Sequence, residues 1–157
     1  MNKESNSLAE SVNFNNPLIS SKFLYELKTF ILEVTKLYQI KFAYLFGSQS
    51  RGTANDKSDI DIAVYFERAY DPLTLALIRG NIIEHGKEFF KKNVDIVSLN
   101  DASLLLKYEI IHDGVVILDN DFRGDFESLS LRMYFDFKYY SDIYDEALIN
   151  RLKQGDF

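Results

Sequence analysis

One stretch of this chain, residues 42–66, limits the available folds more than any other part; it reads FAYLFGSQSRGTANDKSDIDIAVYF. Residues 42–46 are apolar and predict a buried strand that stops at a Gly-Ser pair. Residues 59–66 alternate between polar and apolar types, and in an extended strand successive side chains point to opposite faces of the sheet. The stretch therefore predicts two strands connected by a Gly-Ser turn, a short helix and an exposed polar loop.

The second of these strands presents two carboxylates on one face. Asp59 and Asp61 share that face, whereas the opposite face is wholly apolar and carries Ile60, Ile62, Val64 and Phe66. The two acids would stand roughly 7 Å apart along the strand, and like charges this close raise each other's proton affinity unless a cation lies between them. The pattern favours a divalent-metal site beside a phosphate. The ordinary alternative is an acidic pair on the solvent face of an antiparallel strand.

Composition and charge narrow the class of protein. With 157 residues, 46% hydrophobic and 27% charged, the chain fits one soluble globular domain. Its net charge of -6 argues against a main role in binding the nucleic-acid backbone, which requires a surplus of Lys and Arg. The absence of cysteine excludes disulfides and fits a reducing cytoplasm. Neither a signal peptide nor an apolar run of the roughly 20 residues that a membrane helix needs is visible. We expect a cytoplasmic protein with no membrane segment and no direct nucleic-acid binding.

The rest of the chain alternates between helical and extended patterns, which predicts an α/β or α+β fold. Residues 1–15 are polar and predict a flexible N-terminal arm, and residues 16–157 predict a single domain. Asn16-Pro17 and Asp71-Pro72 are capping pairs that predict helix starts, and Asn100 or Asp101 predicts a third. The predicted strands are 41–46, 59–66, 94–99 and 115–118, and the last predicted helix is 122–152.

Two helices have predicted inner faces. The apolar residues of the first recur at three- and four-residue steps: Phe23, Leu27, Phe30, Ile31, Val34, Leu37 and Tyr38. For the second helix, the expected inner residues are Leu73, Ala76, Leu77, Gly80, Ile83 and Phe90. Two glycines weaken this second pattern.

The C-terminal helix 122–152 carries apolar residues on two sides. One stripe is formed by Phe122, Phe126, Leu129, Met133, Phe137, Tyr140, Tyr144 and Leu148. The other is formed by Leu131, Phe135, Tyr139 and Ile143. A helix that is apolar on two sides must be covered on both, so we expect a homo- or hetero-oligomeric contact through it. The alternative is a helix wedged inside the core.

Two further features complete a candidate site. Gly47 allows the backbone to approach a ligand closely, and the free N–H groups of the following helix, with the Ser48 hydroxyl, favour an anion. Asp95 lies in the predicted third strand and faces away from its apolar neighbours. Each feature alone has an ordinary explanation, a serine helix cap or an exposed acid. Together they give three carboxylates beside an anion site, which suits Mg²⁺ shared with substrate phosphates.

The segment GSQSRGTANDKSDIDIAV resembles the signature of the DNA polymerase β-like nucleotidyltransferase superfamily: Gly-Ser, ten residues, then Asp-x-Asp. It is most similar to the minimal nucleotidyltransferases (MNT proteins) of HEPN/MNT toxin–antitoxin pairs. The matching positions are Gly47, Ser48, Arg51, Gly52, Ser58, Asp59 and Asp61, with Asp95 in the place of the third carboxylate. The resemblance implies a palm-like nucleotidyltransferase fold: a small mixed sheet of about four strands flanked by helices, followed by the long C-terminal helix.

The resemblance also implies adenylyl transfer. The catalytic and metal-binding residues would be Asp59, Asp61 and Asp95, which would hold two Mg²⁺ ions at the triphosphate of ATP and at the acceptor oxygen. The ATP-binding residues would be Gly47, Ser48, Arg51 and Ser58. Arg51 has the alternative role of a salt bridge to an acid such as Asp59, and Lys57 could also reach a phosphate.

Within this family, the small size of the chain and its apolar C-terminal helix favour a protein acceptor. We expect an antitoxin that transfers AMP from ATP to a tyrosine hydroxyl of a cognate HEPN ribonuclease toxin. Two alternatives stay open: an antitoxin that neutralises by binding alone, and a small-molecule adenylyltransferase of the aminoglycoside type. Analogy at the level of the fold does not choose among them.

Overall fold

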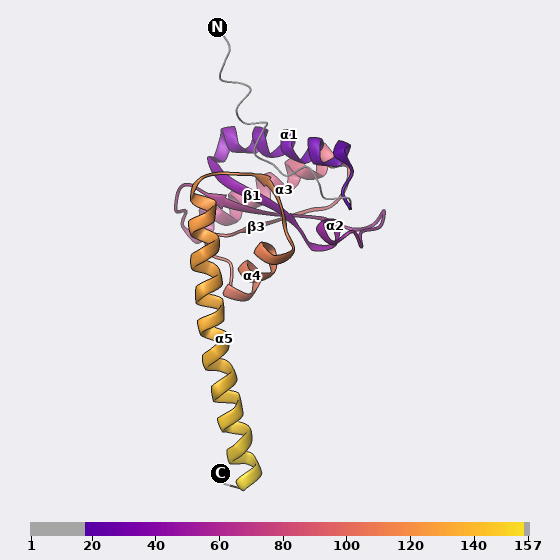
Figure 1. Ribbon diagram of the computed structural model, residues 1–157. Coiled ribbons are helices and arrows are strands. Elements are labelled where there is room, and N and C mark those ends of the chain that lie inside the picture. Colours follow the sequence, from indigo (N-terminus) through magenta and orange to yellow (C-terminus); the bar gives the residue numbers. More distant parts are fainter. Residues whose placement is uncertain (1–17, 156–157) are drawn as a thin grey trace.

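The computed structural model describes residues 18–155, which form a mixed four-stranded sheet with helices on both faces (Figure 1). The strands are β1 (Ile40–Phe46), β2 (Ile60–Phe66), β3 (Val94–Ser98) and β4 (Val115–Leu118), in the order β3-β2-β1-β4. β1 runs antiparallel to both β2 and β4, and β2 runs parallel to β3. The expected small mixed sheet is confirmed. The predicted arm, residues 1–15, lies outside the described residues.

Helices form the two outer layers. They are α1 (Ser21–Tyr38), α2 (Gly47–Arg51), α3 (Pro72–Phe90), α4 (Leu104–Asp113) and α5 (Phe122–Gln154). α1 and α3 pack against one face of the sheet and form the larger apolar core with it. α4 and the first turns of α5 pack against the other face and form a second core. Both faces are therefore covered, and the sheet is buried between two helical layers.

The predicted alternation of side chains along β2 is confirmed, because successive residues pack into the two cores on opposite faces of the sheet. Ile60, Ile62, Val64 and Phe66 all belong to the core under α1 and α3. Ala63 and Tyr65 belong to the core under α4 and α5. The face that carries Asp61 is therefore covered along most of its length, and only its end, where the acids lie, opens to solvent.

The helix starts differ from the predictions in two places. α1 begins at Ser21, and Ser20 caps it by accepting a hydrogen bond from the Phe23 N–H (3.2 Å). The predicted start at 16–17 is wrong for α1, and those two residues lie outside the described part. Asp71 caps α3 as predicted. A serine hydroxyl competes well with asparagine as a cap, and at α1 the serine is the residue used.

Asn100 does not act as the predicted helix cap. α4 is capped by Ser103, whose hydroxyl accepts from the Leu106 N–H, rather than by Asn100 or Asp101. The Asn100 side chain instead bonds both backbone groups of Phe66: its oxygen accepts from the N–H (2.9 Å) and its amide donates to the carbonyl (3.0 Å). It thereby supplies the partner that the last residue of β2 would otherwise lack.

The predicted inner face of α3 is wrong in its first half, where Leu73, Ala76, Leu77 and Gly80 are exposed, and is confirmed at Ile83 and Phe90, which pack against the core. The buried residues of this helix are Leu75, Ile78, Ile82 and Gly86, whereas Leu73 and Leu77 are 72% and 62% exposed. Because apolar residues occupy nearly every position of its first half, several faces fit the pattern equally well. Packing against β3 selects one, since a Cβ at Gly86 would stand only 3.0 Å from the Val94 side chain. In α1 the expected stripe is confirmed except at Leu37, which is exposed.

Only the first part of α5 packs against the sheet. Its buried residues are Phe126 and Ser130, and beyond them the helix extends away from the sheet (Figure 1). Large apolar side chains are exposed along this second part: Met133, Phe135, Phe137, Tyr139, Tyr140, Ile143, Tyr144, Leu148, Ile149 and Leu152. The alternative of a helix wedged in the core is wrong for this part. No helix within residues 18–155 has the length and apolar character required to span a bilayer.

Aromatic packing holds the first turns of α5 against the sheet. Phe42 and Tyr65 stack on neighbouring strands, with ring centroids 4.9 Å apart and ring planes 11° apart. The ring of Phe126 lies against both, at 5.2 and 5.3 Å. Aromatic contacts of this kind contribute about 0.5–1.5 kcal/mol each beyond their buried area.

A hydrogen-bond network beside these rings fixes the orientation of α5 against the sheet. The buried Tyr44 hydroxyl donates to the Glu127 carboxylate (2.6 Å). Arg123 also donates to that carboxylate and bonds Asp119 in a bidentate manner (2.7 and 3.1 Å). Burial, followed by the hydrogen bond to Glu127, raises the pKa of Tyr44 well above its usual range. The hydroxyl therefore stays protonated and remains a donor at all physiological pH values.

We predict that Glu127→Ala destabilises the domain by about 2 kcal/mol, because it leaves the buried Tyr44 hydroxyl without an acceptor. The expected fall in Tm is roughly 4–8 °C in a thermal melt. Adding Tyr44→Phe removes the stranded hydroxyl as well, so the double variant should lose less stability than the sum of the single variants. Equal, additive losses would show that the hydrogen bond does not hold α5 in place.

Candidate active site

The candidate residues meet at one end of the sheet. Asp61 in β2 is paired across the sheet with Asp95 in β3 on one side and with Phe46 in β1 on the other. Adjacent strands lie about 4.8 Å apart, so the two acids are direct neighbours. Gly47 follows Phe46 at once and begins α2. The register of three strands therefore places the predicted acids and the predicted anion-binding turn side by side.

Gly47 is required by its contact with Asp61. Its φ of +71° lies in the left-handed region that favours glycine. A Cβ at this position would also collide with the Asp61 carboxylate, with its Cγ at 3.1 Å. The Ser50 hydroxyl donates to the Gly47 carbonyl (2.9 Å) and fixes the turn. The first turn of α2 is thus held directly against the carboxylate, which explains why the Gly-Ser pair precedes the acidic strand.

The three acids influence one another electrostatically. Partial burial, followed by the negative charges of Asp95 and Asp59, raises the pKa of Asp61 above its ordinary value. Arg51 opposes this effect and lowers the pKa of Asp61. Asp59 and Asp95 are themselves exposed, whereas Asp61 is half-buried between them and the turn. Negative charge is therefore concentrated around Asp61 in excess of the positive charge that faces it.

The donor chemistry of this cluster fits Mg²⁺. Carboxylate oxygens are the ligands that Mg²⁺ prefers, and a divalent cation would neutralise the repulsion that raises the pKa of Asp61. The side chains are not gathered as a finished ligand set, and no group of three acidic or histidine residues within 18–155 forms one. The Asp95 carboxylate accepts a hydrogen bond from the Ile96 N–H (2.9 Å). The metal-binding role of these acids stays a prediction.

Ser48 and Ser58 lie on either side of this cluster. Ser48 is half-buried in α2, and its hydroxyl has no hydrogen-bond partner in the part of the chain that the structure describes. Ser58 is committed to its loop, because its hydroxyl accepts from the Asn55 N–H (2.9 Å) and its own N–H donates to the Asn55 carbonyl (3.0 Å). Ser48 is therefore available to a ligand, whereas Ser58 shapes the loop that leads into β2.

Arg51 links α2 to α4. Its guanidinium lies 3.9 Å from the carboxylate of Asp113 at the end of α4, and both side chains are substantially exposed. The predicted salt bridge exists, but with Asp113 rather than Asp59. An exposed pair at this distance contributes little energy, so Arg51 can leave it for a phosphate. The sequence held no signal for Asp113, because its approach depends on how α4 crosses the sheet.

The sequence is similar to that of a nucleotidyltransferase family and of proteins named protein adenylyltransferase. The model of the family described as Polymerase beta, Nucleotidyltransferase matches residues 29–123, from within α1 to the start of α5. A Methanocaldococcus jannaschii protein, named as a candidate protein adenylyltransferase, is 31% identical over 93 residues, which are 59% of this chain and 96% of that one. The Protein adenylyltransferase MntA of Shewanella oneidensis is 33% identical over 76 residues. That match covers 48% of this chain and about half, 52%, of MntA.

Solved structures with the same fold come from toxin–antitoxin complexes. A crystal structure of a toxin–antitoxin with AMP-PNP contains a chain that is 25% identical, with a TM-score of 0.65, covering 77% of this chain and 98% of that one. A structure of the tri-AMPylated Shewanella oneidensis HEPN toxin in complex with an MNT antitoxin gives a TM-score of 0.61 at 22% identity, over 80% of this chain and 98% of that one. The second likeness concerns the fold alone.

The family match spans more than half of the chain and includes all four strands and the acidic cluster. The archaeal relative supports the same assignment, because the chain covers nearly all of its length. The expected palm-like architecture is also the one observed. This chain therefore belongs to the Polymerase beta nucleotidyltransferase family.

Proposed function

We propose that this protein is an antitoxin that transfers AMP from ATP to a tyrosine hydroxyl of a cognate HEPN ribonuclease toxin and so neutralises it. The observation that carries the proposal is the pairing of Asp61 with Asp95 directly beside the turn at Gly47. Relatives named protein adenylyltransferase support the reaction, and the structural neighbours in toxin–antitoxin complexes support the partner. We place its action in the cytoplasm, with residues 16–157 acting as one domain.

In this proposal the turn and α2 hold the triphosphate of ATP. The N–H groups at the start of α2 have no side-chain cap, and Gly47 lets a ligand approach them closely. The Ser48 hydroxyl donates to the β- or γ-phosphate, and Arg51 exchanges Asp113 for a phosphate oxygen. These contacts leave the α-phosphorus near the acids of β2 and β3.

The transfer itself is an in-line displacement at phosphorus. The tyrosine oxygen forms a bond to the α-phosphorus, the bond from that phosphorus to the bridging oxygen breaks, and pyrophosphate leaves. Asp95 accepts the hydroxyl proton after its carboxylate leaves the Ile96 N–H. Asp59, Asp61 and Asp95 would hold Mg²⁺, which when bound neutralises charge on the phosphates.

The exposed second part of α5 is the surface on which we expect the toxin to dock. Ten large apolar side chains are exposed along it, and exposed apolar side chains gathered on one element mark partner surfaces. Tyrosine and phenylalanine, which are favoured at such interfaces, make up about half of them. This surface also keeps neutralisation by binding alone open as a second function, since such a contact could cover the toxin without any chemistry.

We predict that Asp59→Asn with Asp61→Asn lowers AMP transfer to the toxin by roughly 100- to 1,000-fold. Intact-mass spectrometry of the toxin, after incubation with ATP and Mg²⁺, should show added adenylyl groups with the wild type and none with the variant. Asp101→Asn, an exposed acid outside the cluster, is the matched control. If the double variant still protects cells from the toxin, neutralisation by binding is the correct function.

We also predict that Asp61→Asn stabilises the protein in EDTA at neutral pH. The folded-state pKa of Asp61 is raised, so folding favours its protonated form. The stabilisation from that proton is present below the ordinary pKa of about 3.9 and is lost as pH rises through the folded value. Thermal melts between pH 4 and 8 should therefore show wild-type stability declining relative to the variant. At neutral pH the variant should melt roughly 2–4 °C higher.

The same variant tests the metal site without measuring activity. Mg²⁺ should raise the Tm of the wild type, because it binds the folded state, and should raise that of Asp61→Asn much less. Equal shifts for the two proteins, or a variant less stable than the wild type in EDTA, would contradict the electrostatic description of the cluster.

A third prediction concerns docking. Tyr140→Ala with Tyr144→Ala should weaken toxin binding by roughly 10- to 100-fold in a calorimetric titration, because both rings are exposed on the second part of α5. The free protein should melt unchanged, since alanine favours helix. Asp142→Ala with Glu146→Ala has the same spacing on another side of the helix and serves as control. Unchanged affinity in the tyrosine variant would show that the toxin binds another surface of this protein.

A further inference from the structure

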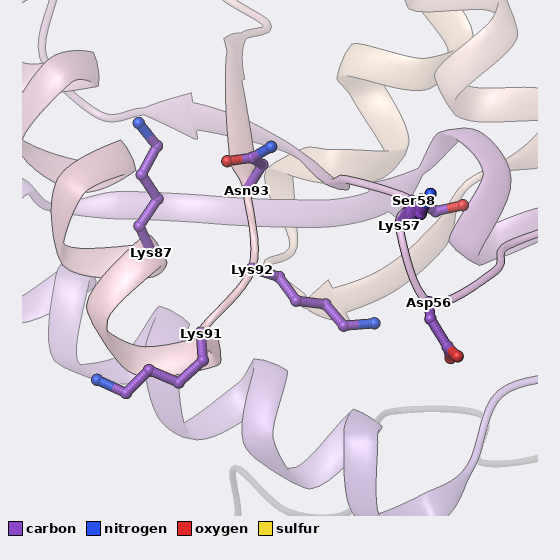
Figure 2. A pocket seen from close by; sticks show the side chains of 7 residues that line it. All are labelled: Asp56, Lys57, Ser58, Lys87, Lys91, Lys92 and Asn93. Atoms are coloured by element: carbon purple, nitrogen blue, oxygen red, sulfur yellow. The ribbon is translucent and has the colours of Figure 1, made fainter.

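A groove lined by lysines opens at the same end of the sheet as the acids. Its volume is about 510 Å³, and its lining residues are Asp56, Lys57, Ser58, Lys87, Lys91, Lys92 and Asn93. Figure 2 shows the loop before β2 on one side and the end of α3 on the other, with Lys92 reaching between them. We call this cavity the lysine groove. Ser58 belongs to the sequence motif and Lys57 lies beside it, but the proposed transfer step uses no residue of this lining.

The groove carries an excess of positive charge although the whole chain has a net charge of -6. Lys87 is paired with Glu84 (3.0 Å). Lys57, Lys91 and Lys92 have no ion-pair partner among residues 18–155. Asp56 is the one acid in the lining. Lys92 reaches toward the loop, whereas the Lys87 and Lys91 side chains point away from it (Figure 2). The lysines of the lining exceed the single acid in charge, and an anionic ligand would neutralise that excess.

The groove adjoins the candidate active site through both strands that carry the acids. Ser58 comes directly before Asp59, and Asn93 lies two residues before Asp95, a distance of roughly 7 Å along a strand. The Ile60 N–H donates to the Asn93 carbonyl (2.9 Å) and ties the two segments together. Since Lys87 and Lys91 come from the end of α3, the groove faces the α3 side of the sheet. The acids lie on the opposite, α4 side of the sheet, so a substrate longer than one nucleotide would pass around the starts of β2 and β3 to extend from the acids into the groove.

The lining indicates which chemical group fits. It contains no aromatic ring, no arginine and no large apolar side chain, so it offers neither a stacking surface for a base nor an anchor for a protein side chain. Lysine ammonium groups act as point charges and bind phosphate oxygens in many proteins. A row of separate phosphates, as in a short nucleotide chain, fits these features best.

We propose that the lysine groove binds the phosphodiester phosphates of AMP units already attached to the acceptor and thereby favours the addition of further units. This inference rests on the proposed function. It is motivated by the positions of Lys57, two residues before Asp59, and of Lys92, three residues before Asp95. More than one addition occurs in a complex of the same fold, which contains a tri-AMPylated toxin.

Each further addition balances as the first does. A ribose hydroxyl oxygen of the attached AMP forms a bond to the α-phosphorus of a new ATP, and the bond to the bridging oxygen breaks with loss of pyrophosphate. The hydroxyl proton passes to Asp95 and then to solvent. The lysines take no part in bond making; they hold the phosphates of the earlier units while the new acceptor hydroxyl lies at the acids.

The test compares successive additions. Wild type and Lys57→Gln/Lys92→Gln are incubated with ATP, Mg²⁺ and toxin, and intact-mass spectrometry follows toxin with one, two and three AMP units over time. We expect the rate of the second and third additions, relative to the first, to fall about tenfold in the variant, from the loss of two charged contacts. Salt should reduce the same ratio in the wild type.

Matched variants separate charge from structure. Lys57→Arg/Lys92→Arg keeps the charge and should restore most of the ratio. Lys36→Gln/Arg68→Gln removes two exposed positive charges at the opposite end of the sheet and should leave the ratio unchanged.

The outcomes distinguish this inference from the proposed function. A wild type that transfers no AMP overturns the proposed function, and the inference falls with it. A wild type that adds several units at rates unchanged by Lys57→Gln/Lys92→Gln overturns the groove alone. A raised KM for ATP with a slower first addition would assign the groove to the triphosphate and would likewise overturn the proposal, as would a wild type that stops at one unit.

Discussion

The structure depends on one register: Phe46, Asp61 and Asp95 lie side by side on β1, β2 and β3. Because side chains alternate along a strand, a slip of one residue in either pair would send an acid to the core under α1 and α3. The apolar set of β2 fixes this register, since Ile60, Ile62 and the following alternate residues must be buried. The same burial that stabilises the domain thus places the carboxylates against the turn at Gly47.

Much of the fold could be predicted from the sequence because its signals are local. Alternation in β2, the capping pair at Asp71 and the Gly-Ser turn each require only a few neighbouring residues, and all appear where predicted. Gly47 was predicted for closeness to a ligand, and the structure adds a second reason, the Asp61 carboxylate beside it.

What could not be predicted depends on contacts between distant segments. The inner face of α3 is chosen by the approach of Gly86 to Val94, and the partner of Arg51 is chosen by the crossing of α4. The lysine groove likewise exists only because a loop and a helix end meet at the sheet. At the site, the pattern indicated which acids belong together, but the orientation of Asp95 toward the Ile96 N–H depends on a side-chain rotation that no sequence pattern encodes.

The length of α5 has a consequence for geometry. From Ser130, its last buried residue, to its end at Gln154, the helix rises about 36 Å, longer than the radius of the domain that carries it. A partner held near the tip would therefore sit far from the acids, and its tyrosine would have to reach back along the whole helix. In an assembly with two or more toxin molecules, α5 can bind one toxin molecule while another receives AMP.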